Sequence, residues 1–352
     1  MRILYITYDP ETSRYCGIYR ASIEYINSMR LVYNKIDQIG LNKFNETNIV
    51  NLYNYDIVII HTSLSEKVKK AIHKIKVHKR VKICLLIIYE TENIPSVWRD
   101  YSRGTDMFIV PTYLMKNILI NNGYKEDIYV VQHNIQNRIL ELADRKSPCF
   151  YKDYYVFYTI CKIDDPRKNI SNLIRTYLKT FTNKDKVFLY IKGYQNNKVL
   201  NNFAIKPDSP LLKIDTRNVS DDDIINIHLR CNCYISLAHS EGVGLGMLEA
   251  STLGKPVITT GYGGQMEYIN DGYFVDYKLD KININYSYFN SNQFWAYPNY
   301  NHASKILHEV YNNQEKAKEI GEKNKIYVAE NFNSLKIGNK FVSIINNFLE
   351  KN

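Results

Sequence analysis

The sequence lacks any apolar run that could cross a membrane as a helix. Runs such as residues 83–89 stop well short of the about 20 residues that a membrane helix needs. The amino-terminal residues also lack the charged segment, long apolar stretch and small-residue cleavage site of a signal peptide. We therefore expect a cytoplasmic protein that at most lies on a membrane surface.

The six cysteines lack the paired spacing of a zinc ribbon or a disulfide framework. They are scattered along the chain, and most lie within apolar runs. For Cys231 and Cys233, the period of two along a strand would place both thiols on one face. We interpret this pair as core residues rather than metal ligands.

Acidic residues are outnumbered, because the chain has 46 lysines and arginines against 36 aspartates and glutamates, a formal net charge of +10. This excess favours anionic partners but does not define the chemistry. Many of the cations lie between Lys67 and Lys79, where Val68, Ile72 and Ile75 would share one face of a helix. A solvated surface helix is one interpretation. Peripheral contact with an anionic membrane or a nucleic acid is the other.

At 352 residues the chain is long enough for two domains, each with its own hydrophobic core. Short β-branched runs alternate with longer amphipathic stretches, a pattern typical of doubly wound parallel sheets. The pattern pauses around residues 135–150 and then resumes. We predict strands at residues 3–7, 57–60, 81–89, 107–110 and 128–131 in the first half, and at 154–160, 187–191, 211–214, 233–237 and 256–260 in the second.

This alternation predicts an α/β protein with two Rossmann-like domains. We place the first domain at residues 1–140 and the second at 150–330. The tail of the chain has helical spacing, and we expect its last helix, at about 335–352, to return to the first domain.

Two further segments carry local predictions. Residues 281–301 are polar and aromatic without a clear period, and we predict a loop there. Ser220 precedes three aspartates, Asp221 to Asp223, at the start of a helical stretch. We predict that these residues cap the helix and charge its first turn rather than bind a metal ion.

A glycine-rich segment in the second half carries the strongest chemical signal. It follows a predicted strand, places glycines at Gly242, Gly244 and Gly246, and then enters a helix. Small residues let a ligand approach the backbone, and the N–H groups at a helix start favour a phosphate. Glu241 lies in the loop and Glu249 about two turns into the helix. Their carboxylates therefore suit the hydroxyls on both sides of a bound diphosphate.

Considered alone, these residues also fit a glycine-rich turn with two solvated glutamates. The segment resembles, however, the E-x7-E signature of the large family of retaining glycosyltransferases with the GT-B fold, which includes glycan-building enzymes and glycogen synthases. The resemblance continues through Gly254-Lys-Pro-Val-Ile and through Gly263-Gly-Gln-Met-Glu with the glycine turn after it. It implies two Rossmann-like domains that face each other across a cleft and bind a nucleotide-diphosphate sugar there.

The resemblance implies a role for each residue of the segment. Glu241 would contact hydroxyls of the transferred sugar, and Glu249 would bind the ribose of the nucleotide. The diphosphate would be held by backbone groups of the loop, namely Gly242, Val243, Gly244 and Leu245.

Residues 158–170 resemble the family's strand and basic loop, in which an arginine and a lysine grip the diphosphate. Lys168 matches the lysine and Arg167 precedes it, whereas Lys162 replaces the upstream arginine and loses its bidentate geometry. We assign leaving-group stabilisation to Arg167 and Lys168, and donor binding to Lys162. These cations and the helix-end N–H groups would take the place of a metal ion, so we expect neither a metal nor a cofactor.

The first half offers weaker candidates. Gly17 follows the first predicted strand, where the family usually has a glycine-rich turn that faces the donor. Glu90 stands five residues before a proline, as in one branch of the family, and is a candidate on the acceptor side. His61 and His133 each end a predicted strand. Each of them is either an acceptor-side residue or a structural one.

We therefore expect a metal-independent retaining glycosyltransferase. It would move a sugar from a donor of the UDP or GDP type to an acceptor hydroxyl on a glycan, glycolipid or glycoprotein. Two alternatives stay open. One is a transferase that glycosylates modified DNA, which would combine the positive charge with the motif. The other is an inactive protein that only binds a nucleotide sugar.

Overall fold

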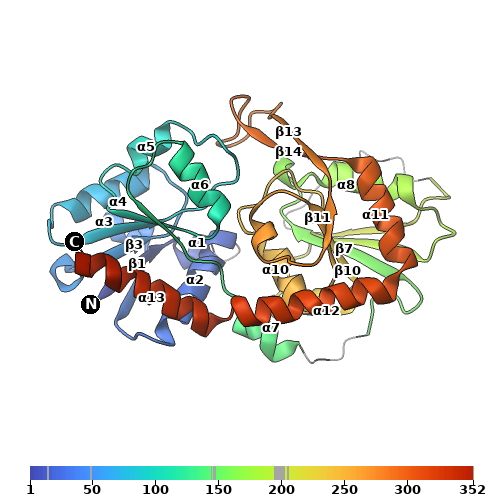
Figure 1. Cartoon of the computed structure of the whole chain (residues 1–352), viewed down its shortest axis with the longest axis horizontal. Helices are drawn as coiled ribbons and strands as arrows, with labels where there is room; N and C mark the ends of the chain where they lie inside the picture. The colour runs from blue at the N-terminus through green and yellow to red at the C-terminus, as the bar shows by residue number, and fades with distance from the viewer. Residues whose placement is uncertain are drawn as a thin grey trace. The chain divides into compact units, whose positions relative to one another are not determined.

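The computed structural model describes residues 1–13, 16–47, 50–143, 145, 148–193, 203 and 206–351. Its contacts divide the chain into two units (Figure 1). The first unit comprises Met1–Ile135 and Asn331–Asn352, and the second comprises Gln136–Glu330. The first unit thus ends before the predicted limit at residue 140. Of the residues in the predicted last helix, Asn352 lies outside the described part of the chain.

The first unit is built on a six-stranded sheet of order β2-β1-β3-β4-β5-β6, in which every pairing is parallel. Its strands are β1 (Ile3–Thr7), β2 (Ile36–Gly40), β3 (Ile57–Ile60), β4 (Lys82–Leu86), β5 (Met107–Val110) and β6 (Asp127–Val130). Its helices are α1 (Pro10–Ser13), α2 (Gly17–Arg30), α3 (Leu41–Glu46), the 3-10 turn η1 (Leu52–Asn54), α4 (Glu66–Lys76), α5 (Val97–Tyr101), α6 (Tyr113–Asn121) and α13 (Ser334–Lys351).

The last helix, α13, belongs to the first unit because it packs against α2. Its apolar face buries Ile337, Phe341 and Ile345 in the same cluster as Tyr25 of α2. A side chain at Gly338 would collide with the backbone of Ser28, so glycine lets the two helices approach closely.

The second unit has its own six-stranded sheet, of order β12-β11-β10-β7-β8-β9 and again parallel throughout. Its strands are β7 (Tyr155–Cys161), β8 (Val187–Gly193), β9 (Leu211–Asp215), β10 (Cys233–Ser236), β11 (Val257–Thr260) and β12 (Tyr273–Val275). Its helices are α7 (Asn137–Leu142), η2 (Pro166–Lys168), α8 (Ile170–Thr180), α9 (Asp221–Arg230), α10 (Leu245–Thr252), η4 (Gly264–Glu267), α11 (Tyr300–Asn312) and α12 (Gln314–Asn331).

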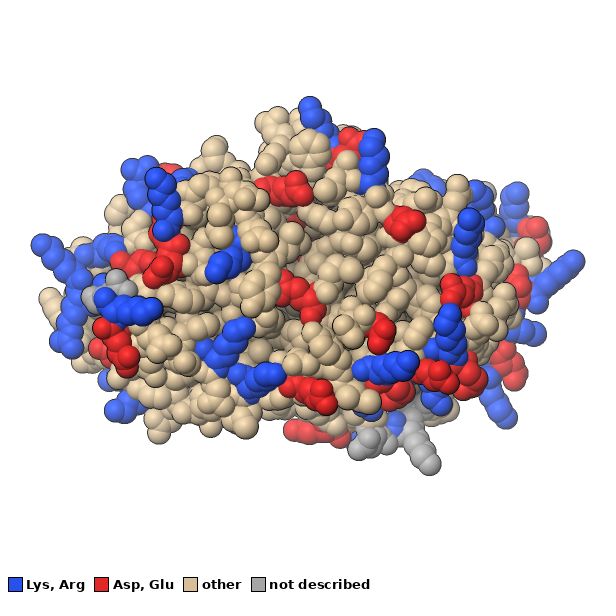
Figure 2. Space-filling view, in the orientation of Figure 1, with Lys and Arg blue, Asp and Glu red and all other residues tan. Residues whose placement is uncertain are grey.

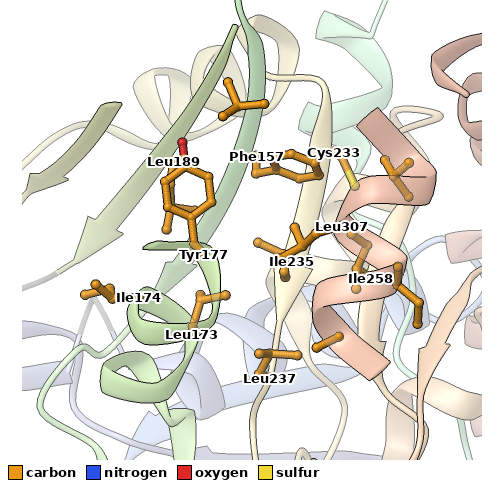
Figure 3. Close-up of a cluster of buried hydrophobic side chains, with 14 of the residues drawn as sticks. Phe157, Leu173, Ile174, Tyr177, Leu189, Cys233, Ile235, Leu237, Ile258 and Leu307 are labelled. Carbon is orange, nitrogen blue, oxygen red and sulfur yellow. The ribbon is translucent and has the colours of Figure 1, made fainter. Parts of the chain in front are cut away.

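Both units bury their sheets between helices. In the second unit, Phe157 and Ile235 of the sheet pack in one cluster with Tyr177 of α8 and Leu307 of α11, two helices that contact each other on the same face (Figure 3). Charged side chains of both signs are interleaved over the face shown in Figure 2. A parallel sheet covered on both faces needs continuous apolar strands, and β3, Ile-Val-Ile-Ile, is buried along its whole length. The structure therefore confirms the predicted α/β architecture with two Rossmann-like units.

Three local predictions can be compared with this fold. The predicted loop at residues 281–301 is wrong in part, because β14 (Phe294–Pro298) pairs antiparallel with β13 (Tyr277–Lys281). The predicted cap is confirmed: the Ser220 hydroxyl accepts from the Asp223 N–H at 3.1 Å, and Asp223 accepts from the Ser220 N–H at 3.0 Å.

The cysteine pair lies in the interior, but not on one strand. Both Cys231 and Cys233 are buried, and Cys233 belongs to the main core cluster of the second unit. Strand β10 begins only at Cys233, whereas Cys231 ends α9, so the shared strand face was wrong. Their packing in the core fits the interpretation as core residues.

Candidate functional site

The strand order of the second sheet reverses between β7 and β10. The chain leaves β7 toward β8 on one side and leaves β10 toward β11 on the other, which opens a crevice at the carboxyl ends of the two strands. A cavity of about 30 Å³, enough for about one water molecule, marks this point. Its lining includes Thr159 to Cys161, Tyr234, Ser236, Lys168, Glu241 and Gly244 to Met247.

The glycine loop forms the start of α10 in this crevice. Gly244 adopts a left-handed conformation with φ 80° and ψ 59°, which glycine tolerates best. The Tyr268 hydroxyl lies 2.9 Å from the Val243 carbonyl and 2.7 Å from the Gly244 carbonyl. A hydrogen bond from this hydroxyl therefore holds the backbone of the loop in place. A side chain at Gly246 would collide with the Tyr234 hydroxyl. The sequence could not reveal Tyr268, because its contact depends on the folded loop.

Glu241 lies between the two cations that were predicted to grip a diphosphate. Arg167 Nη1 donates to Oε2 at 3.0 Å, and Lys168 Nζ lies 2.6 and 2.8 Å from the two carboxylate oxygens. Glu241 is only 6% exposed, so the interpretation as a solvated glutamate is wrong. Burial by itself would raise the pKa of Glu241, but Lys168 and Arg167 outweigh it and hold the pKa below its ordinary value.

Arg167 and Lys168 are themselves fixed by the local turn. They end η2, which Asp165 caps by accepting from the Arg167 N–H at 3.0 Å. Arg167 also donates to the Ser240 carbonyl at 2.5 Å, and its own carbonyl accepts from the His239 N–H at 2.8 Å. The turn after β7 and the loop after β10 are therefore joined by charged and neutral hydrogen bonds.

Glu249 lies about one turn into α10, rather than the predicted two, and it is buried. Gln136 donates to its Oε1 at 3.0 Å, and His228 Nε2 lies 3.2 Å from its Oε2. The Tyr158 hydroxyl lies 2.7 Å from Nδ1 of the same histidine. Gln136, His228 and Tyr158 thus form a chain of polar groups that orients the Glu249 carboxylate. These three residues were not singled out from the sequence.

Lys162 lies at the end of β7 and is half exposed. Its ammonium donates to the Tyr286 hydroxyl at 3.3 Å and lies 4.0 Å from Asp164. Tyr286 comes from the segment between β13 and β14, which was predicted to be part of a loop.

The β13–β14 hairpin also holds the loop that carries Glu241. The Trp295 ring stacks on His239 with centroids 4.8 Å apart and 15° between planes. His239 Nδ1 lies 2.7 Å from the Ala296 carbonyl, and the Ala296 N–H donates to the His239 carbonyl at 2.9 Å. The hairpin segment therefore contacts both Lys162 and His239 in the loop that carries Glu241.

In the first unit, strand order reverses between β1 and β3, and His61 directly follows β3. The hydroxyls of Tyr5 and Ser22 lie 2.8 and 2.9 Å from its Nδ1, whereas Nε2 is buried and finds no hydrogen-bond partner in the described part of the chain. Burial lowers the pKa of His61 to about 3, and the nearby His133 adds to this effect.

The other candidates of the first unit lie around the same sheet edge. His133 is buried, with Nδ1 2.7 Å from the Asn134 carbonyl. The Tyr25 ring lies 5.2 Å from His133 and 5.9 Å from His61, so it joins the two histidines. Gly17 is the first residue of α2, and Glu90 is half-buried after β4.

Among the described residues, no three His, Cys, Asp or Glu side chains are arranged to hold a metal ion. None of the helices in the described part of the chain has both the length and the apolar character that a membrane span requires.

Known structures share this fold. A glycosyltransferase from Rickettsia africae is 16% identical, with a TM-score of 0.72 and full coverage of both chains. Sucrose-phosphate synthase from Thermosynechococcus elongatus is 11% identical, with a TM-score of 0.75 and full coverage of both. Anabaena HepE, solved in complex with UDP-glucose, is 12% identical, with a TM-score of 0.68 and coverage of 99% of this chain and 100% of its own. These likenesses identify the GT-B fold.

A comparison with curated proteins finds no match. The family described as glycosyl transferases group 1 matches residues 143–326, which is more than half of the chain and includes Arg167, Lys168, Glu241 and Glu249. The chain therefore belongs to the group 1 glycosyl transferases.

Proposed function

We propose that this enzyme is a retaining glycosyltransferase that uses a nucleoside-diphosphate sugar and needs no metal ion. The observation that carries the proposal is the cluster of Arg167, Lys168 and Glu241 at the β7–β10 crevice, beside the start of α10. The HepE complex with UDP-glucose supports a donor of this class. The base, UDP or GDP type, is part of what the experiment below decides.

In this proposal the diphosphate binds to the cations and to the N–H groups at the start of α10. Lysine has three donors and arginine five, so Lys168 and Arg167 can hold Glu241 and still donate to phosphate oxygens. The first N–H groups of a helix have no acceptor within it and favour an anion. Together these groups stabilise the negative charge that grows on the leaving diphosphate, which is the work of a metal ion in other transferases.

Glu241 keeps acceptor capacity for the sugar. An ionised carboxylate offers about four lone-pair sites, and Arg167 and Lys168 occupy three through the observed bonds. The remaining site can accept from a sugar hydroxyl and favours positive charge at the anomeric carbon as the bond to phosphate breaks. Glu249, held by Gln136 and His228, would accept from the ribose hydroxyls.

Retention follows if the acceptor attacks from the face that the diphosphate leaves. The bond from the anomeric carbon to the phosphate oxygen breaks, the bond to the acceptor oxygen forms, and the acceptor proton passes to a phosphate oxygen. We assign recognition of the acceptor, on a glycan, glycolipid or glycoprotein, to the first unit with His61, His133 and Glu90. Cytoplasmic location is part of the same proposal.

The test is donor turnover in the presence of EDTA. The enzyme would be incubated with UDP-, GDP- and ADP-sugars, and release of the nucleoside diphosphate and the product anomer would be followed by NMR. We expect one donor class to be consumed with the anomeric configuration kept. Activity that needs added magnesium or manganese would exclude the metal-free mechanism, and an inverted product would exclude retention. Binding without any turnover would favour a nucleotide-sugar-binding protein.

A further inference from the structure

The lysines of α4 are largely engaged within the first unit. Lys69 pairs with Asp100 at 2.7 Å, Lys76 pairs with Asp106 at 3.1 Å, and Lys67 donates to Asn42 at 2.7 Å. Lys74 donates to the backbone carbonyls of Phe44 and Thr47. The basic run between Lys67 and Lys79 therefore offers less free charge to an anionic partner than its sequence indicates.

The most exposed large apolar side chains of the described residues lie just beyond this helix. Val77 is 77% exposed and Tyr53 is 74% exposed, more than any other large apolar side chain in the described part of the chain. They come from different connections, the turn after α4 and the 3-10 turn η1, yet both line one cavity of about 210 Å³. The Tyr53 ring packs edge-on against His78, with centroids 4.7 Å apart. Two apolar tips thus stand together at the surface.

Cations flank this apolar pair. Lys79 and Arg80 line the same cavity. Arg80 is 82% exposed and approaches Asp56 only at 4.0 Å, and Lys79 makes no ion pair with the described residues. Arg80 and Lys82 also line a neighbouring cavity of about 410 Å³ beside Met1. Figure 2 shows lysine and arginine side chains gathered along the outer margin of the first unit.

We propose that Tyr53, Val77, Lys79 and Arg80, the η1–α4 patch, bind the surface of an anionic lipid bilayer. Apolar side chains at the centre would enter the interfacial region, and the cations beside them would meet anionic head groups. A nucleic acid would use the cations but would leave Val77 exposed. The combination of exposed apolar side chains with a highly exposed arginine and a lysine beside them favours the lipid surface.

The test is co-sedimentation with vesicles of phosphatidylcholine that contain about 30% phosphatidylserine, at about 0.1 M salt. We expect the wild-type protein to bind these vesicles and to dissociate at high salt or from pure phosphatidylcholine. The double variant Lys79→Gln, Arg80→Gln should bind roughly 25-fold more weakly, since each of the two cations near an anionic surface contributes about fivefold. The variant Tyr53→Ser, Val77→Ser should also lose most of its binding.

A matched control comes from the second unit, where α12 exposes Ile326, Lys323 three residues before it and Lys318 farther along the helix. The variant Ile326→Ser, Lys318→Gln, Lys323→Gln removes the same chemistry and should bind vesicles as the wild type does. Equal loss in this control, or no vesicle binding by the wild type, would overturn the proposal. Loss of binding to duplex DNA with unchanged vesicle binding in the patch variants would assign the patch to nucleic acid instead.

A variant with a new fluorescence signal tests the proposal without relying on the loss of vesicle binding. Trp98 and Trp295 are both buried, so a tryptophan placed in the patch would be the exposed one. In Val77→Trp, we expect the emission to shift to shorter wavelength when anionic vesicles are added, as the ring leaves water. Binding without any shift would show that Val77 stays in water and would contradict the proposed geometry.

Discussion

At the carboxyl edge of the second sheet, Glu241 lies between Arg167 and Lys168, whereas at the same edge of the first sheet His61 lies between Tyr5 and Ser22. Both sites are buried, and both lie where the strand order reverses. The first is a cluster of full charges, and the second is a cluster of neutral polar groups.

The difference lies in how each site deals with burial. Removal of a charge from water is costly unless partners compensate for it. Glu241 has two cationic partners, and its pKa stays below the ordinary value despite burial. His61 Nδ1 faces two hydroxyls, and burial together with the nearby His133 keeps the imidazole neutral with a pKa of about 3. Equivalent positions in two similar sheets thus hold different groups, a carboxylate between two cations at one and an imidazole beside two hydroxyls at the other.

The largest expected effect comes from a change in the charged cluster of Glu241, Arg167 and Lys168 at the edge of the second sheet. Glu241→Gln keeps the size of the side chain but removes the charge that, in the proposed mechanism, favours the cationic sugar in the transition state. We expect turnover to fall by about 10²- to 10³-fold. Affinity for the nucleoside diphosphate should be kept or increase, because Arg167 and Lys168 lose their anionic partner.

Calorimetry with UDP or GDP and steady-state turnover of the donor separate these two effects. Circular dichroism should show that the variant folds, since a buried ion pair has been altered. Wild-type turnover in Glu241→Gln would show that Glu241 has no catalytic role. The difference in charge between the two sheet edges would then have no bearing on catalysis.

The second effect concerns Glu249, which lies at the same edge but is bonded to an amide and an imidazole, those of Gln136 and His228. Glu249→Ala should weaken binding of the nucleoside diphosphate by roughly tenfold to a hundredfold, as expected for loss of a charged hydrogen-bond partner. Calorimetry measures this directly. Gln136→Ala, which removes only a partner of Glu249, should have a smaller effect. Unchanged affinity in Glu249→Ala would exclude it from the nucleotide site.

The third prediction concerns His61 at the edge of the first sheet and the pH dependence of the free energy of unfolding. Below pH 6.5 the unfolded chain protonates His61, whereas the folded chain does not until about pH 3. Stability from this group is therefore complete above pH 6.5 and is lost as the pH falls. Between pH 7.5 and 5.0 the loss should be about 2 kcal/mol. His61→Gln should lack this part of the loss.

Urea unfolding of wild type and His61→Gln at the two pH values provides the measurement, with Trp98 as a reporter in the first unit. His73→Gln is the control, since His73 is exposed on α4 and should leave the pH dependence unchanged. Parallel losses in wild type and His61→Gln would show that His61 is not kept neutral by burial.

Much of this comparison was readable from the sequence, for physical reasons that differ between segments. Buried parallel strands such as β3 appear as unbroken β-branched runs, so all the predicted strands are present. Strand β2, at the edge of its sheet, carries Asp37 and Gln38 and gives no such signal. Strand β14 is stabilised by pairing with β13 and by the stack of Trp295 on His239, which no local pattern reveals.

The candidate site divides in the same way. Glu241, Glu249, Arg167 and Lys168 could be predicted as candidates because their motifs are local. The ion pairs join residues more than seventy positions apart, so the sequence could not show that the predicted phosphate-binding cations already hold Glu241. Tyr268 and His228 were missed because a tyrosine or histidine becomes a positioning residue only through its neighbours in the fold.

The smallest expected effect concerns Tyr286, which joins the hairpin to Lys162. A half-exposed lysine loses side-chain conformational entropy when it binds a ligand. The hydrogen bond to Tyr286 already restricts Lys162 before binding, so less entropy is lost on binding. Tyr286→Phe should therefore weaken binding of the nucleoside diphosphate by about threefold. Tyr297→Phe is the matched control, because its hydroxyl donates to the Lys281 carbonyl within the hairpin at 3.0 Å and not to Lys162. In a Lys162→Gln background, Tyr286→Phe should have no further effect, since the two residues act together. An equal effect in both backgrounds would show that Tyr286 does not act through Lys162. The charged cluster at this sheet edge would then comprise Arg167, Lys168 and Glu241 without Lys162.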